Sequence, residues 1–115
     1  MSLPWVRLDT GFADNPKVLG LVADRKHRAV LAYLLGLAYS GKHELDGFIP
    51  RGALSVIHAT AGDARSLVDA RLWHATDGGW LINGWDEFQI SSEESQRRRD
   101  KAQKAAMKRW HGGDE

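Results

Sequence analysis

The most apolar stretch of the chain runs from residue 29 to residue 39, AVLAYLLGLAY. Its large apolar residues recur at helical spacing and cover more than half of a helix circumference. The stretch is long enough for about three helical turns, and its leucines and alanines favour a helix over a strand. A helix this apolar is expected to be buried on several sides, so we predict that the rest of the chain packs around it. Gly41 is the predicted C-cap of this helix.

The chain has 115 residues, which is enough for one hydrophobic core and too few for two. The absence of cysteine excludes disulfides and thiolate metal sites. The longest apolar run is shorter than the roughly 20 residues that span a bilayer, and the N-terminus lacks the pattern of a secretory signal. We therefore expect a cytoplasmic protein that does not enter the membrane.

Charged residues are distributed unevenly along the chain. Residues 1–90 carry nine Lys/Arg and ten Asp/Glu, whereas residues 97–111 carry seven Lys/Arg and one Asp. A near-neutral body is thus followed by a basic segment, a pattern typical of proteins with an interaction tail. We predict one folded domain over residues 1–90 and a basic helical extension over residues 91–115.

Capping and turn residues divide the first part of the chain into short elements. Alternating apolar and polar residues over residues 5–8 predict a short strand, and residues 9–13 are typical of a turn. Asp14 or Asn15 can cap a helix that has Pro16 at its first position, where the missing N–H would have had no partner.

Two short helices are predicted after residue 50. Residues 51–59 and 64–72 each carry apolar residues at helical spacing, and the four residues between them include a glycine. Asp63 is the predicted N-cap of the second helix. This arrangement matches a helix-turn-helix, and the alternative is another kind of small α+β domain with a hairpin.

A β-hairpin is predicted directly after the second helix, with strands over residues 73–76 and 80–82. The predicted wing turn between the strands consists of Asp77, Gly78 and Gly79. Asp-Gly between two such strands is a strong hairpin signal, and Trp73 and Trp80 are expected to pack across the hairpin. Residues 48–50 are expected to be extended, because a residue before proline avoids the helical region, and they would add a third strand. The predicted class is α+β: a winged helix-turn-helix with a small antiparallel sheet and a C-terminal basic helix.

Four segments resemble a known protein family. They are Trp5-Val6-Arg7-Leu8, Asp14-Asn15-Pro16-Lys17-Val18, Asp46-Gly47-Phe48-Ile49-Pro50 and Gly84-Trp85-Asp86-Glu87-Phe88-Gln89. In this order they look like the N-terminal domain of phage replisome-organiser and replication-initiation proteins, including prophage proteins of actinobacteria. The resemblance implies a winged helix, DNA binding near a replication origin and contacts with other replication proteins.

Candidate DNA contacts in the body are side chains of the predicted helix-turn-helix. Arg65 and Ser66 lie near the start of the second helix, where a recognition helix contacts bases and phosphates. Arg51 and Arg71 flank this region and are further candidates. Acidic neighbours leave an ordinary exposed helix face as the alternative interpretation.

The basic segment predicts a helix with one charged stripe. Its predicted DNA-binding residues are Arg97, Arg98, Lys101, Lys104, Lys108 and Arg109. Four of them recur at helical spacing, so they can follow a phosphate backbone. Ala102, Ala106 and Trp110 fall on the opposite face, a candidate surface for a partner protein or a homodimer. The alternative is a solvated basic tail.

The remaining sequence patterns do not indicate catalysis or metal binding. The five histidines lack the spacing of a helical metal motif, and no nucleophile or phosphate-loop motif is present. We expect no enzyme activity, no cofactor and no metal. Three functions stay open. The first is binding of DNA, double-stranded rather than single-stranded, in a phage or prophage replication module. The others are a transcriptional or excision regulator on the same fold, and a protein-interaction adaptor that does not bind DNA.

Overall fold

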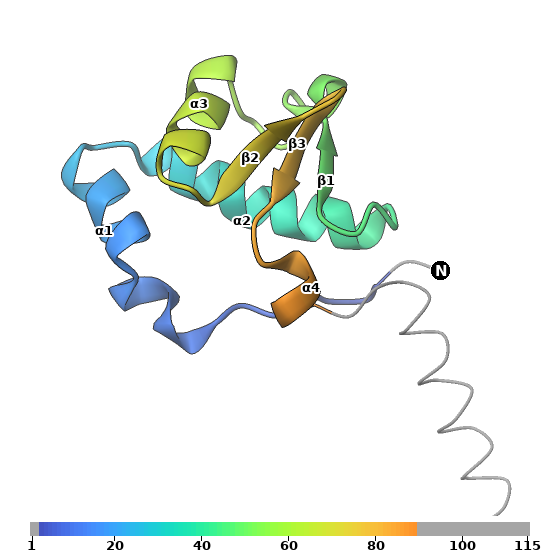
Figure 1. Cartoon of the computed structure of the whole chain (residues 1–115), viewed down its shortest axis with the longest axis horizontal. Helices are drawn as coiled ribbons and strands as arrows, with labels where there is room; N and C mark the ends of the chain where they lie inside the picture. Colours follow the sequence, from blue (N-terminus) through green and yellow to red (C-terminus); the bar gives the residue numbers. More distant parts are fainter. Residues whose placement is uncertain (1–2, 90–115) are drawn as a thin grey trace, which may run out of the picture.

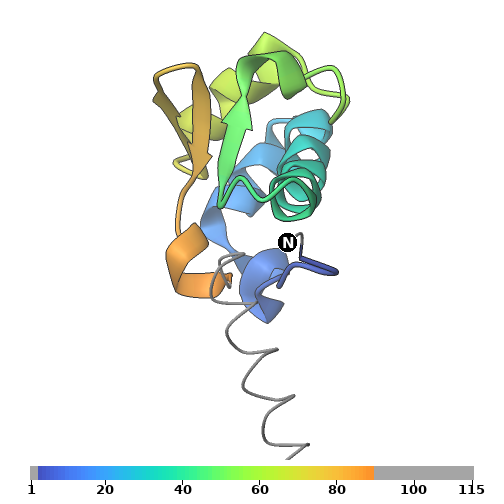
Figure 2. The same cartoon turned by 90° about the vertical axis from the view of Figure 1, so that its right-hand side faces the viewer.

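The computed structural model of this chain describes residues 3–89. These residues form an α+β domain in which helices and a small antiparallel sheet pack together (Figure 1). In chain order the elements are the 3₁₀ helix η1 (Thr10–Asp14), the helices α1 (Pro16–Ala23) and α2 (His27–Lys42), the strand β1 (Phe48–Pro50), the 3₁₀ helix η2 (Arg51–Ala53), the helix α3 (Ala61–Asp69), the strands β2 (Trp73–Thr76) and β3 (Gly79–Ile82), and the short helix α4 (Trp85–Phe88). Seen from the side, the sheet lies along one side of α2 (Figure 2).

The three strands pair antiparallel in the order β1-β3-β2. The register pairs Trp73 with Ile82 and Thr76 with Gly79 in the hairpin, and Phe48 with Leu81 between β1 and β3. The predicted strands over residues 48–50 and 73–76 are confirmed, and the last strand begins one residue earlier than predicted. The order of helices and strands is consistent with a winged-helix layout.

The core lies between α2 and the sheet. Trp73 is 1% exposed, and its ring centroid lies 5.9 Å from that of Trp80, which confirms the predicted packing of the two rings. Gly36 in α2 faces the same indole, because a Cβ built on Gly36 would lie 3.1 Å from Cζ2 of Trp73. A residue without a side chain therefore makes room in α2 for the largest side chain of β2.

α2 contacts α1, α3 and β1, so it is covered on more than one side, as predicted, and a strip of it remains exposed. Its buried positions are Ala29, Ala32, Gly36, Leu37, Ser40 and Gly41. By contrast Leu31 is 49% exposed, Ala38 is exposed and Leu34 is only half-buried. The small residues let α1, α3 and β1 pack closely against the helix. A domain of this size has too few other elements to cover the far side as well.

α1 and α3 each end at an arginine with a left-handed backbone. Arg25 has a φ of +59° and Arg71 a φ of +63°. In both cases the next residue donates its N–H to a carbonyl five positions back, Lys26 to Leu21 at 2.8 Å and Leu72 to Leu67 at 2.9 Å. These are the hydrogen bonds of a Schellman motif, in which the left-handed residue is usually glycine.

Gly41 is not the end of α2, contrary to the prediction. The helix continues to Lys42, and Glu44, with a φ of +59°, is the left-handed residue that follows it. A Cβ on Gly41 would lie 2.6 Å from Cγ1 of Val6, and the carbonyl of Gly41 accepts the N–H of Leu3 at 3.0 Å. Gly41 is therefore the point where the N-terminal segment crosses α2.

The region predicted as a helix-turn-helix departs from the prediction in two places. Residues 51–53 form a single 3₁₀ turn and turns follow to residue 58, so the predicted helix over residues 51–59 is wrong. α3 begins at Ala61 and ends at Asp69, three residues earlier than predicted at each end, because Thr60 is its N-cap and Ala70 its C-cap. Thr60 Oγ1 accepts the N–H of Asp63 at 3.2 Å, and the Asp63 carboxylate accepts the N–H of Thr60 at 2.9 Å. This capping box places Asp63 inside the first turn of α3.

The predicted strand over residues 5–8 is absent from the described structure. Leu3 and Val6 pack against the core, while Trp5 is 76% exposed. The side chain of Gln89 forms hydrogen bonds with both the backbone N–H and the C=O of Arg7. These two groups are therefore paired without a neighbouring strand.

The segment before α1 agrees more closely with the sequence. Most of the predicted turn over residues 9–13 belongs to η1, with the Asp9 carboxylate accepting the N–H of Gly11 at 2.7 Å. Asn15 caps α1 through the N–H of Lys17 at 2.9 Å, and Pro16 occupies the first helical position, as predicted.

Within residues 3–89, no helix is long and apolar enough to cross a membrane. The basic helix predicted for residues 91–115 lies outside the described residues, as does the homodimer surface predicted on it.

Candidate functional site

α3 presents one basic side chain to solvent, that of Arg65. Ser66 is half-buried, and its Oγ donates to the carbonyl of Gly62 at 3.0 Å, so the hydroxyl proton is engaged within the helix. The carboxylate of Asp63 is held by the N–H of Thr60 at the helix start. Of the two residues predicted in this helix, Arg65 is therefore the one with a side chain free of hydrogen bonds inside the described domain.

Arg51 lies against the hairpin turn. Its backbone N–H donates to the carbonyl of Gly78 at 2.9 Å, and its guanidinium carbon lies 5.3 Å from the ring centroid of Trp80, a cation–π contact. Asp77 and Gly78 are exposed beside it. Gly79 is buried, and a Cβ at this position would collide with the carbonyl oxygen of Ile49. The structure thus brings Arg51 together with the predicted wing residues.

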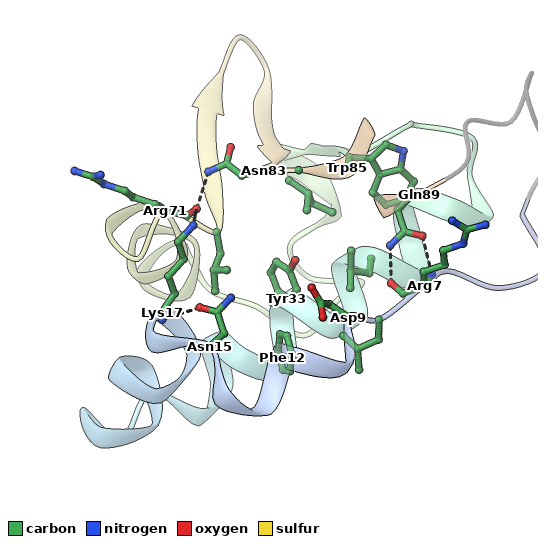
Figure 3. Close-up of a pocket in the computed structure, with 15 residues that line it drawn as sticks. Arg7, Asp9, Phe12, Asn15, Lys17, Tyr33, Arg71, Asn83, Trp85 and Gln89 are labelled. Carbon is green, nitrogen blue, oxygen red and sulfur yellow. Dashed lines mark hydrogen bonds between the residues drawn. The ribbon is translucent and has the colours of Figure 1, made fainter. Parts of the chain in front are cut away.

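Arg71 lies at the other end of β2 from the turn. Its carbonyl accepts Nδ2 of Asn83 at 2.8 Å and Nζ of Lys17 at 3.3 Å. In Figure 3 its guanidinium points away from these contacts. The structure therefore separates Arg71 from Arg51 and ties its backbone to α1 and to the end of β3.

A cleft of about 130 Å³ lies between the N-terminal segment, α2 and the turn after β3 (Figure 3). Its floor includes Phe12 and Tyr33, which stack with ring centroids 5.6 Å apart and planes at 21°. The hydroxyl of Tyr33 points into the cleft near Asp9 (Figure 3). Burial raises the pKa of Tyr33, and the negative charge of Asp9 raises this pKa further. The Tyr33 hydroxyl is therefore protonated at neutral pH.

Hydrogen bonds fix both ends of this cleft. At one end Asn83 binds the carbonyl of Arg71 through Nδ2 and the ring of His74 through Oδ1. Since Oδ1 of Asn83 can only accept, Nδ1 of His74 is the donor. At the other end Gln89 donates to the carbonyl of Arg7 at 2.6 Å and accepts its N–H at 2.7 Å.

Sequence reasoning did not predict the cleft. Phe12, Tyr33 and Asn83 come from three separate parts of the chain, and none belongs to a motif with a known ligand. The nearest sequence signal was the pair of segments 5–8 and 84–89, whose ends the structure joins through Arg7 and Gln89.

Six of the predicted DNA contacts lie outside the described residues. They are Arg97, Arg98, Lys101, Lys104, Lys108 and Arg109. Within the described part of the chain, no three His, Asp or Glu side chains converge in a way that could hold a metal ion.

Comparison with known proteins finds no match for the chain among protein-family models, curated proteins or solved structures. The resemblance to phage replication proteins therefore stands on the order of four short segments alone.

Proposed function

We propose that this chain is a winged-helix protein that binds double-stranded DNA. The observation that carries the proposal is the position of Arg51, a cation bound to the turn of a hairpin whose first strand contacts α3. In such an arrangement α3 can enter the major groove while the hairpin turn contacts the adjacent backbone. Arg65 would then read bases, and Arg51 would bind phosphate.

The charge distribution supports a two-part interface. Residues 1–90 have one more acidic than basic residue, so the body as a whole has little general attraction for DNA. Residues 97–111 carry six more basic than acidic residues and would supply most of the non-specific phosphate binding. The body would provide orientation and base recognition.

A role in phage or prophage replication is the biological setting that we propose for this DNA binding. It rests on the resemblance of the four segments, and contacts with other replication proteins would follow from it. A transcriptional or excision regulator would use the same fold and the same contacts. Mapping the bound sequence relative to an origin or a promoter distinguishes these roles.

A second function, protein-interaction adaptor, is favoured by the apolar surface of the body. Trp5 is 76% exposed and Val56 58% exposed, and both are large apolar side chains on a body without excess positive charge. An adaptor would use such side chains as anchors in a partner's pockets.

The test is fluorescence anisotropy of the full chain on a random duplex and on selected target sites, at two salt concentrations. Arg65→Ala should cost about 1–3 kcal/mol on a preferred site and reduce the preference at particular bases. Arg51→Gln should weaken binding to all duplexes alike and flatten the salt dependence by about one unit. Lys42→Gln, a change of the same charge at the far end of α2, is the control. Wild-type protein that binds no duplex at low salt would contradict the proposal and favour the adaptor.

A further inference from the structure

The turn between α1 and α2 carries the densest run of basic residues in the described body. Arg25, Lys26, His27 and Arg28 are consecutive, and all four are exposed. Three of the nine Lys/Arg of residues 1–90 thus lie within four positions. No motif in the sequence distinguishes this run from an ordinary charged surface. Its position in the fold, relative to α3 and the hairpin, is what indicates a role.

Hydrogen bonds hold the backbone of this turn. The N–H of Arg25 donates to the carbonyl of Val22 at 3.0 Å, and the N–H of Lys26 donates to the carbonyl of Leu21 at 2.8 Å. Both bonds of the Schellman motif are therefore present at the end of α1. The backbone that carries the basic side chains is therefore already ordered, so less conformational entropy is lost when these side chains bind a partner.

The turn lies on the opposite side of α3 from the hairpin. β2 contacts α3 on one side. On the other side, a groove of about 260 Å³ separates α3 from α1, and it is lined by Lys17 and Lys26 on one wall and by Ser66 and Asp69 of α3 on the other. Figure 1 shows α3 between α1 and the β2–β3 hairpin. Basic side chains thus lie on both sides of α3: Arg51 at the hairpin and the basic turn across the groove.

The acidic residues near the turn are Asp24 and Asp69, both of which line the groove. Against them stand Lys17 and Lys26 in the groove wall and the two arginines of the turn. The local balance is therefore positive, although the body as a whole has a slight negative excess. A polyanion that follows α3 would meet this positive surface.

We propose that the basic turn, residues 25–28, binds backbone phosphates of the same duplex that α3 and the hairpin contact, on the side of α3 away from the hairpin. This inference rests on the proposed function and adds to it. A duplex lying along α3 would be held by Arg51 at one side and by Arg25, Lys26 and Arg28 at the other. The contacts would be independent of base sequence, because they go to phosphates.

The test uses the full chain carrying Arg25→Gln, Lys26→Gln and Arg28→Gln together. Each phosphate contact removed should flatten the slope of log affinity against log salt by about 0.9, so a change of about two to three units is expected, equal on all duplexes. The single change Lys42→Gln, at the other end of α2, removes a charge that the proposal places away from the duplex, so the slope should stay at the wild-type value. Hydroxyl-radical footprinting should show that the triple variant loses protected sugars at one edge of the footprint and keeps those at the other.

The outcomes separate this inference from the proposed function. Wild-type protein that binds no duplex overturns both. Wild-type binding with an unchanged slope and footprint in the triple variant overturns the basic turn alone. A change in slope per removed charge that is as large for Lys42→Gln as for the triple variant also overturns it, because the effect would then come from net charge and not from the position of the charges. If the triple variant has a lowered urea midpoint, Lys26→Gln alone should still flatten the slope by about one unit, and no change there counts against the proposal.

Discussion

Gln89 binds the backbone of Arg7 across 82 residues of sequence, with two reciprocal hydrogen bonds of 2.7 and 2.6 Å. Its carboxamide accepts the N–H and donates to the C=O of one residue, as a neighbouring β-strand would. Gln89 is 9% exposed, so water competes little for these groups. The pair joins the two ends of the described domain and closes one end of the cleft.

Loss of this pair should loosen the N-terminal segment. Gln89→Ala removes both hydrogen bonds and leaves partly buried backbone groups unpaired, so we expect a loss of about 1–3 kcal/mol in the free energy of unfolding. Gln89→Glu is the matched control, because a carboxylate accepts the Arg7 N–H but cannot donate to its carbonyl. Its loss should be at least as large as that of the Ala variant at neutral pH, because a buried carboxylate would face the Arg7 carbonyl oxygen. Urea unfolding measures both, and an Ala variant with the wild-type midpoint would show that the pair contributes nothing.

Gly36 should tolerate no larger side chain. A Cβ at this position lies 3.1 Å from the indole of Trp73, which is 1% exposed and has nowhere to move. Gly36→Val should therefore destabilise the domain by about 1–3 kcal/mol through overpacking. Gly20→Ala in α1 is the contrasting change, because no atom lies within 4 Å of its Cβ position apart from its chain neighbours and the backbone of its own helix. It should stabilise by about 0.5–1 kcal/mol through helix propensity, and equal effects at the two glycines would contradict the packing.

Gly78 should be required for the hairpin turn. Its φ of +81° is a region that side chains with a Cβ rarely adopt, and β-branched residues least of all. We expect Gly78→Val to cost about 1 kcal/mol or more, and Gly78→Asn to cost less because asparagine tolerates left-handed backbone. If the hairpin contacts DNA, the Val variant should lose more affinity than its loss of folded protein explains. Native stability together with native binding would argue against the turn and against its DNA contact.

The domain should lose stability at high pH through Tyr33. The pKa of Tyr33 is raised above 10.0 in the folded state, first by burial and second by the charge of Asp9. Below pH 10 the Tyr33 hydroxyl keeps its proton in both the folded and the unfolded state, so its contribution to stability is fully present. As the pH rises above 10 the unfolded state ionises first, so stability falls until the folded-state pKa is passed.

Tyr33→Phe should remove this alkaline loss, because phenylalanine keeps the ring that stacks on Phe12 and has no proton to release. Tyr39→Phe, on the same helix, is the control and should leave the loss caused by Tyr33 in place. Asp9→Asn should lower the pKa of Tyr33 but not return it to 10.0, since burial is the larger cause. Urea midpoints measured from pH 8 to 11 test all three variants, and a Phe variant with the wild-type pH profile would contradict this assignment.

Local patterns in the sequence were sufficient for the elements that local chemistry determines. Asn15 and Pro16 predict the start of α1, because a side-chain acceptor and a missing N–H both suit a first helical turn. Asp-Gly between two strand-like runs predicts the hairpin, and the proline at position 50 predicts the extended β1. The separation into a near-neutral body and a basic segment is likewise a property of sequence alone.

The tertiary structure decided what depends on neighbours distant in sequence. Glycine often ends a helix, yet α2 continues past Gly41 to Lys42, and Val6 occupies the space that a side chain at position 41 would need. Arg71 takes a left-handed position that glycine usually fills, and its carbonyl there accepts hydrogen bonds from Asn83 and Lys17, which are distant in sequence. Packing fixes these positions through contacts between segments, and a local pattern carries no information about which segments will meet. For the same reason the cleft beside Tyr33, and the place of the basic turn across a groove from α3, follow only from the assembled fold.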